Sequence, residues 1–144
     1  MKPIVCAVRG GPGSHFTRRA ALERSIATGA PLYILVTVAP DAYLPLHAGE
    51  QRAIRAELAW RELALARADA SQLGQPDAQF NIQVRVGDLG ETLAAFAAEV
   101  DAGAVLIGSP RDAVDAALNG TDVEELIDGV AQLTNADVSV IAPG

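Results

Sequence analysis

Residues 80–108, FNIQVRVGDLGETLAAFAAEVDAGAVLIG, place a helical stretch between two short β-rich runs. Residues 80–86 strictly alternate apolar and polar side chains, which predicts a half-exposed strand at or near a sheet edge. Residues 89–100 repeat apolar side chains at helical spacing, and Asp88 stands where an N-cap belongs. Residues 104–107 are continuously apolar, as in a buried strand. The stretch therefore predicts one strand–helix–strand unit of a parallel sheet.

The same alternation extends over the rest of the chain. Further strands are expected at residues 3–8, 32–38 and 138–142. Helices are expected from Ser14 to Gly29, from Glu50 to Leu73, and after Thr121, which forms a capping-box pattern with Glu124. The order βαβαβαβαβ predicts a doubly wound α/β fold: one domain, residues 1–144, with five parallel strands and helices on both faces.

Two of the predicted helices carry apolar residues at a spacing that indicates their buried faces. The buried stripe of the first is expected to include Phe16, Ala20, Ile26 and Ala27. The long helix is expected to bury a wide apolar face, consisting of Ile54, Leu58, Trp60, Leu63 and Leu65. On the same helix, Glu57 and Arg61 stand at the spacing of an ion pair.

Composition and charge exclude several classes of function. The 144 residues carry a net charge of −7, which divides into 9 − 5 = +4 for residues 1–68 and 2 − 13 = −11 for residues 69–144. Without a broad basic face, nucleic acid and an anionic membrane surface are not expected partners. A single cysteine, the absence of long apolar runs and an N-terminus unlike a signal peptide lead us to expect a cytoplasmic protein.

The glycine-rich segment 10–13 invites comparison with phosphate-binding loops. A Walker A loop needs a lysine, and the only lysine is Lys2, whereas a Rossmann fingerprint needs a third glycine where Phe16 stands. Two interpretations stay open: a glycine-rich turn, or an anion site made electropositive by Arg9 and neighbouring arginines. The acidic cluster from Asp112 to Asp128 is read as a solvated surface, with a cation site as the alternative.

No catalytic or metal-binding set is apparent. Ser14 and His15 are adjacent in sequence, and adjacency does not create a nucleophile and base, so Ser14 is read as an N-cap. Cys6 lies within an apolar run and is read as an inert core residue. His15 and His47 are far apart and lack metal-ligand spacing. We therefore expect no enzymatic activity and no metal site.

The chain resembles the universal stress protein family over essentially its full length. The resemblance rests on PIVCAV with its glycine turn, LYILVTV, VRVGD before a helix, AVLIGS, and the terminal NADVSVIAPG. It implies strand order 3-2-1-4-5 and a homodimer paired through the last strand. The implied interface residues are Val138, Val140 and Ile141.

The resemblance also implies where a ligand would bind. Family members that bind ATP carry an Asp at the end of strand 1, and this chain has Arg9 there. After strand 4 they carry Gly, two residues, Gly, nine residues, Gly, then Ser or Thr. Here Gly108 matches, Arg111 replaces the second glycine, and Gly120 and Thr121 close the motif after only eight residues. The candidate ligand residues are therefore Arg9, Gly10, Val38, Gly108, Arg111, Gly120 and Thr121.

These departures argue against ATP. Arg9 removes a carboxylate acceptor, and Arg111 blocks the close approach of backbone to phosphate. Asp122, Glu124 and Glu125 compete with phosphate at the start of a helix. We therefore expect a non-catalytic stress-response protein that acts by binding or signalling without a cofactor. The alternatives are a member that binds ATP, AMP or a small anion held by Arg9 and Arg111, and a structural domain that binds an unidentified protein through its dimer edge.

Overall fold

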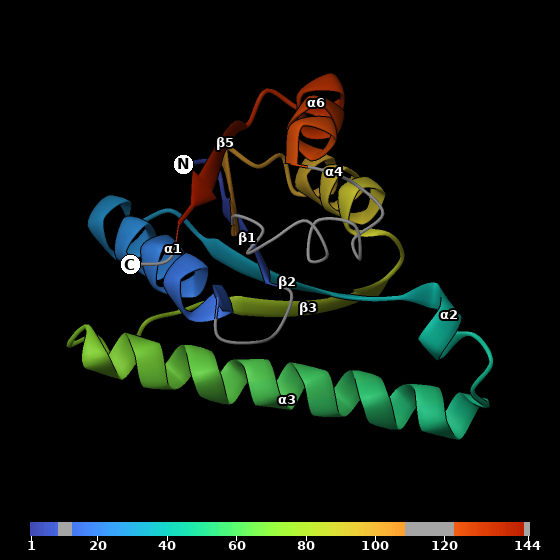
Figure 1. The fold of residues 1–144 in the computed structure, drawn as a ribbon. Helices are drawn as coiled ribbons and strands as arrows, with labels where there is room; N and C mark the ends of the chain where they lie inside the picture. Colours follow the sequence, from blue (N-terminus) through green and yellow to red (C-terminus); the bar gives the residue numbers. More distant parts are fainter. Residues whose placement is uncertain (9–12, 109–122, 143–144) are drawn as a thin grey trace.

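The computed structural model describes residues 1–8, 13–108 and 123–142, and it contains one five-stranded parallel sheet. The strand order β3-β2-β1-β4-β5 confirms the predicted order and places β3 at an edge, as its alternating sequence indicated. Figure 1 shows the elements around this sheet. Its strands are β1 (Ile4–Val8), β2 (Leu32–Val38), β3 (Asn81–Val86), β4 (Ala104–Gly108) and β5 (Asp137–Ile141).

Helices cover both faces of the sheet. One face carries α1 (Gly13–Thr28) and α3 (Ala48–Gln72), and the other carries α4 (Leu89–Glu99) and α6 (Val123–Leu133) (Figure 1). The central strand β1 serves both layers, because successive side chains of a strand point to opposite faces. Ile4, Cys6 and Val8 pack with α1 and α3, whereas Val5 and Ala7 pack with α4 and α6.

The connection between β2 and α3 contains a short helix, α2 (Pro40–Tyr43), in a segment where we predicted neither a helix nor a strand. The long helix also begins earlier than expected, because His47 acts as its N-cap in a reciprocal capping box with Glu50. At the other helix starts, α1 begins at Gly13, so that Ser14 lies inside its first turn. Asp88 is the N-cap of α4 but makes no side-chain capping bond, and the predicted cap Thr121 lies outside the described residues.

The predicted buried faces of α1 and α3 are wrong for their largest side chains, whereas Ala20 and Leu58 pack on the core as predicted. On α1, Phe16 and Ile26 are exposed, and the buried side chains are Ser14, Thr17, Arg18, Ala21 and Leu22. On α3, Trp60, Leu63 and Leu65 are exposed, and the buried side chains are Glu62, Ala66, Asp69 and Ala70. The physical reason is that the two helices meet through charged groups, which leaves Phe16 of α1 and Trp60 of α3 on the outside.

None of the helices in the described ranges is long and apolar enough to span a bilayer.

Candidate ligand site at the carboxyl ends of the strands

The sheet changes winding direction between β1 and β4. The helix that follows β1, α1, packs on one face, and the helix α6, which lies after β4 in the chain, packs on the other. In open parallel sheets this reversal leaves a crevice beyond the carboxyl ends of the two strands, and ligands bind there. The fold thus places its candidate ligand site beyond Val8 and Gly108.

The structure describes two of the seven predicted ligand residues. Gly108 ends β4 and Val38 ends β2. These strands flank β1 on either side, so both residues lie at the carboxyl ends of the strands. The other five predicted residues lie outside the described part of the chain: Arg9, Gly10, Arg111, Gly120 and Thr121.

Val38 is tied into the neighbouring turn. Its carbonyl oxygen accepts a hydrogen bond from the Gly87 amide at 3.0 Å, and its side chain packs on the α1 and α3 side of the core. Gly87 has φ +152°, and a Cβ there would collide with Oγ1 of Thr92. Only glycine fits this turn without strain. The hydrogen bond that holds the end of β2 therefore requires a glycine at position 87.

Thr17 is a site residue that the sequence analysis missed. Its side chain is 1% exposed, and Oγ1 has no hydrogen-bond partner among the residues that the structure describes. A Cβ on Gly108 would lie 2.9 Å from this oxygen, so Gly108 is what allows the hydroxyl to lie against the end of β4. A signal existed in the sequence, because Ser14 and Thr17 are one helical turn apart, directly after the glycine-rich segment.

A buried ion cluster fixes α1 against α3. Nε of Arg18 lies 2.7 Å from Oε1 of Glu62, and its Nη1 lies 3.0 Å from Oδ2 of Asp69. The other Asp69 oxygen lies 2.9 Å from Nδ1 of His15, so the cluster reaches the first turn of α1. Burial disfavours the charged guanidinium, but the hydrogen bonds that it donates to Glu62 and Asp69, together with their negative charges, outweigh burial and raise the pKa of Arg18. The cluster thus positions the helix that begins at the candidate site.

The described part of the chain holds no reactive thiol. Cys6 is fully buried in β1, and this burial raises the pKa of its thiol from 9.0 to about 12. The side chain is therefore protonated at neutral pH, and a protonated thiol is a poor nucleophile. Both histidines make contacts within the helical layer: His15 pairs with Asp69, and His47 is the N-cap of α3. No group of three potential metal ligands occurs within the described ranges.

The N-terminal end of α6 is acidic. Glu124 and Glu125 stand in its first turn, and both are exposed. This helix begins two residues after Thr121, the position at which the resemblance places the end of a phosphate-binding motif. Carboxylates here occupy the positive end of the helix dipole, where a phosphate would otherwise be favoured.

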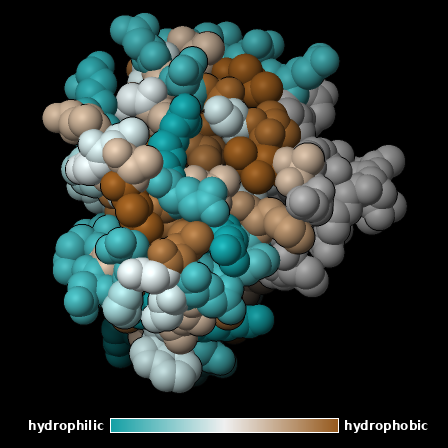
Figure 2. All heavy atoms as spheres, turned by 90° about the vertical axis from the view of Figure 1, so that its left-hand side faces the viewer, coloured by the Kyte–Doolittle hydropathy of each residue, from teal (hydrophilic) through white to brown (hydrophobic). Residues whose placement is uncertain are grey.

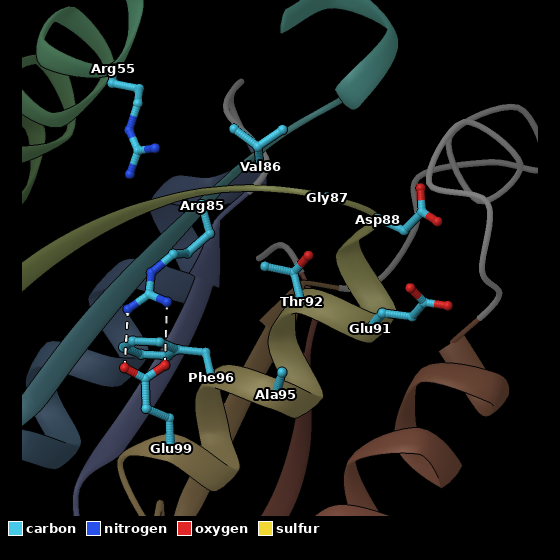
Figure 3. Close-up of a pocket in the computed structure, with 10 residues that line it drawn as sticks. All are labelled: Arg55, Arg85, Val86, Gly87, Asp88, Glu91, Thr92, Ala95, Phe96 and Glu99. Carbon is cyan, nitrogen blue, oxygen red and sulfur yellow. Dashed lines mark hydrogen bonds and ion pairs between the residues drawn. The ribbon is translucent and has the colours of Figure 1, made fainter. Parts of the chain in front are cut away.

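A cavity of about 370 Å³ opens between the end of β3 and α4, away from the ends of β1 and β4 (Figure 3). Its two arginines are already engaged. Arg85 pairs with both oxygens of Glu99, at 3.2 and 3.3 Å, and lies over the Phe96 ring at 5.1 Å, while Arg55 donates to the Val84 carbonyl at 2.9 Å. Asp88 and Glu91 point away from this pair in Figure 3. Both arginines of this cavity are thus held by contacts within the protein, and its carboxylates are those of Asp88, Glu91 and Glu99.

Comparison with known proteins gives one family. A family model described as the universal stress protein family matches residues 1–141. Solved structures share the fold at low identity, including a universal stress protein from Archaeoglobus fulgidus in complex with dAMP (21% identity, TM-score 0.65, 98% of both chains). A second universal stress protein, in complex with cAMP, is similar at 19% identity and TM-score 0.65, covering 97% of this chain and 95% of that one. UspA from Lactobacillus plantarum is similar at 16% identity and TM-score 0.61, covering 97% of both chains. No curated protein sequence matches the chain significantly.

Proposed function

The chain belongs to the universal stress protein family, and from this premise we propose that it is a non-catalytic, cytoplasmic stress-response protein that acts by binding or signalling without ATP. The observation that carries the proposal is the pair Glu124 and Glu125 in the first turn of α6. Two carboxylates next to a triphosphate repel it and compete for the same backbone N–H groups. Arg9 and Arg111, which replace the Asp and Gly of the ATP-binding members, support the same conclusion.

We also propose that the protein forms a homodimer through β5. This strand is an edge of the sheet, and Val140 is 40% exposed on it. Figure 2 views the molecule from the side where β5 lies in Figure 1, and hydrophobic side chains are open at that surface. An edge strand with an exposed apolar side chain tends to pair with another strand. A second copy would hydrogen-bond to the free backbone groups of β5 and cover its exposed apolar side chain.

A smaller anionic ligand is the second candidate function. Two structural neighbours are in complex with dAMP and cAMP, which carry one phosphate each. The buried Thr17 hydroxyl is a donor at the strand ends, without a partner in the part of the chain that the structure describes. If AMP binds here, Thr17→Val should weaken it at least tenfold, since a buried hydroxyl bonded to a charged group stabilises by about 1.5 to 3 kcal/mol.

Titration calorimetry with ATP and with AMP, each with and without magnesium, tests the two candidates. We expect no heat of ATP binding for the natural sequence and a measurable heat for the double variant E124Q/E125Q, because the repulsion is removed. Asp128→Asn is the matched control, an exposed carboxylate of α6 beyond its first turn. Tight, stoichiometric ATP binding by the natural sequence would overturn the proposal.

A further inference from the structure

The outer side of α3 carries a line of exposed apolar residues. This line, the α3 stripe, consists of Ala53, Ala56, Trp60, Leu63 and Ala64, all of them exposed. Trp60 is 72% exposed and Leu63 is 38% exposed. The spacing of three and four residues from Ala53 to Leu63 places these side chains on one face of a helix, in the pattern of a two-helix seam.

The α3 stripe is not the face by which α3 joins its own molecule. That contact is made by Glu62, Ala66, Asp69 and Ala70, which are buried, and by Leu58 and Ala59, which pack on the core. In Figure 1, α3 runs along the outside of the molecule, with the sheet and α1 on one side of it only. A helix of 25 residues therefore leaves an apolar seam unused.

The charges beside the α3 stripe are also unused. Glu57 and Arg61 lie one turn apart on one flank of it, at the spacing that predicts an ion pair within the helix. That pair is not formed. Neither side chain has an ion pair or a hydrogen bond within residues 1–8, 13–108 and 123–142. One carboxylate and one guanidinium thus stand free next to the exposed Trp60.

We propose that the α3 stripe is the docking site of a second copy of this chain, with the two α3 helices antiparallel about a two-fold axis near Trp60. In that arrangement each residue of one α3 faces a residue of the other α3, and the numbers of the two facing residues add up to about 120. The large Leu63 then faces the small Ala56 of the second copy, and like flanks meet, so that Glu57 comes within about one turn of Arg61 of the second copy. The stripe is complementary to itself in both size and charge, which is what a two-fold interface requires.

Paired cysteine variants test this geometry. A mixture of Ala56→Cys and Ala64→Cys proteins should form a disulfide-linked heterodimer under mild oxidation, at least tenfold faster than either variant alone. Residues 56 and 64 face each other in the proposed register, whereas two copies of residue 56 are about eight residues, or roughly 12 Å, apart along the pair. The buried Cys6 does not interfere. Ala56→Cys mixed with Leu65→Cys is the matched control, since Leu65 is exposed on another face of α3.

Sedimentation velocity provides an independent measurement. In the Val140→Asp background, which removes the β5 contact, Leu63→Glu should lower the association constant at least tenfold, whereas Leu65→Glu should leave it unchanged. Reversing one charge, in Glu57→Arg or Arg61→Glu, should weaken association, and the double reversal should restore it. The proposal is overturned by equal linking in all cysteine samples, by fast linking of Ala56→Cys with itself, or by association that Leu63→Glu does not alter.

Discussion

Arg18 is 3% exposed, between two carboxylates that are buried almost as deeply, Glu62 at 5% and Asp69 at 4%. Removing charges from water costs several kcal/mol for each ion, and their attraction offsets this cost only with good geometry. Here the distances of 2.7 and 3.0 Å supply that geometry. The three residues stabilise the contact of α1 with α3 only as a set, since each alone would be a buried, uncompensated charge.

Replacing Arg18 alone should therefore be severe. We expect Arg18→Met to lower the free energy of unfolding by about 3 to 5 kcal/mol, because two buried carboxylates lose their cation. The triple variant R18M/E62L/D69L should recover most of this loss, because apolar side chains of similar size remove the desolvation cost. Urea denaturation followed by circular dichroism measures both. A triple variant no more stable than the single one would contradict this account.

Cys6 makes stability depend on alkaline pH. The unfolded thiol loses its proton near pH 9.0, whereas the buried thiol keeps it until about pH 12. Between these values the folded protein binds one more proton than the unfolded chain, so the free energy of unfolding falls by about 1.4 kcal/mol per pH unit. Cys6→Ala should lack this contribution. Denaturation curves of both proteins at pH 8, 9 and 10 measure it, and parallel pH profiles would contradict the burial of this thiol.

The buried residues of α1 and α3 could not be predicted from apolar spacing. The pattern of Phe16 and Ile26 indicated one face of α1, yet the helix buries Thr17 and Arg18. An ion cluster between residues more than 40 positions apart in the chain has no local signature, because each charged residue alone is expected to be exposed. The burial of Thr17 could not be predicted for a related reason, since it depends on the absence of a side chain at the distant Gly108.

The strands were far more predictable than the helix faces. The predicted strand 32–38 coincides with β2, and the other four strands end within one residue of their predicted limits. Strands buried on both faces are continuous apolar runs, and turn residues bound them sharply. The start of α3 was less predictable, because His47 is not among the residue types that usually cap helices.

The turn between β3 and α4 depends on Gly87. We expect Gly87→Ala to lower the free energy of unfolding by about 1 to 3 kcal/mol, because alanine is strained at φ +152° and its Cβ meets Thr92. Adding Thr92→Ala should relieve the collision and leave the backbone strain, so the double variant should recover only part of the loss. Gly129→Ala is the control, since a Cβ there meets nothing within 4 Å. Thermal unfolding would contradict the account if Gly87→Ala behaved like the control.

At the scale of the whole molecule, the three predicted interface residues of β5 lie in different environments. Val138 packs on the α4 and α6 side of the core, and Ile141 packs on the α1 and α3 side, whereas Val140 is 40% exposed. Of the three predicted interface residues, Val140 can therefore be changed with the least damage to the fold. The structure thus separates three residues that the resemblance implied as one interface set.

Val140→Asp should separate copies that pair through β5, because a charge would be buried between two edge strands, and it should leave the α3 contact in place. Light scattering coupled to size exclusion measures the mass at several concentrations. Leu133→Glu serves as the control, because Leu133 is 59% exposed on α6 and lies outside the strand. A dimer that survives Val140→Asp and dissociates with Leu63→Glu would place the main contact at α3 instead.

Trp60 is the only tryptophan of the chain, and it stands 72% exposed on α3. In the monomer the indole is in contact with water before the protein unfolds, so the fluorescence emission of the monomer should change little on denaturation. Covering the same ring by another apolar surface should move the emission to shorter wavelength. The residue is therefore a poor reporter of folding but a built-in optical probe of contacts made by the outer face of α3, and it needs no attached dye.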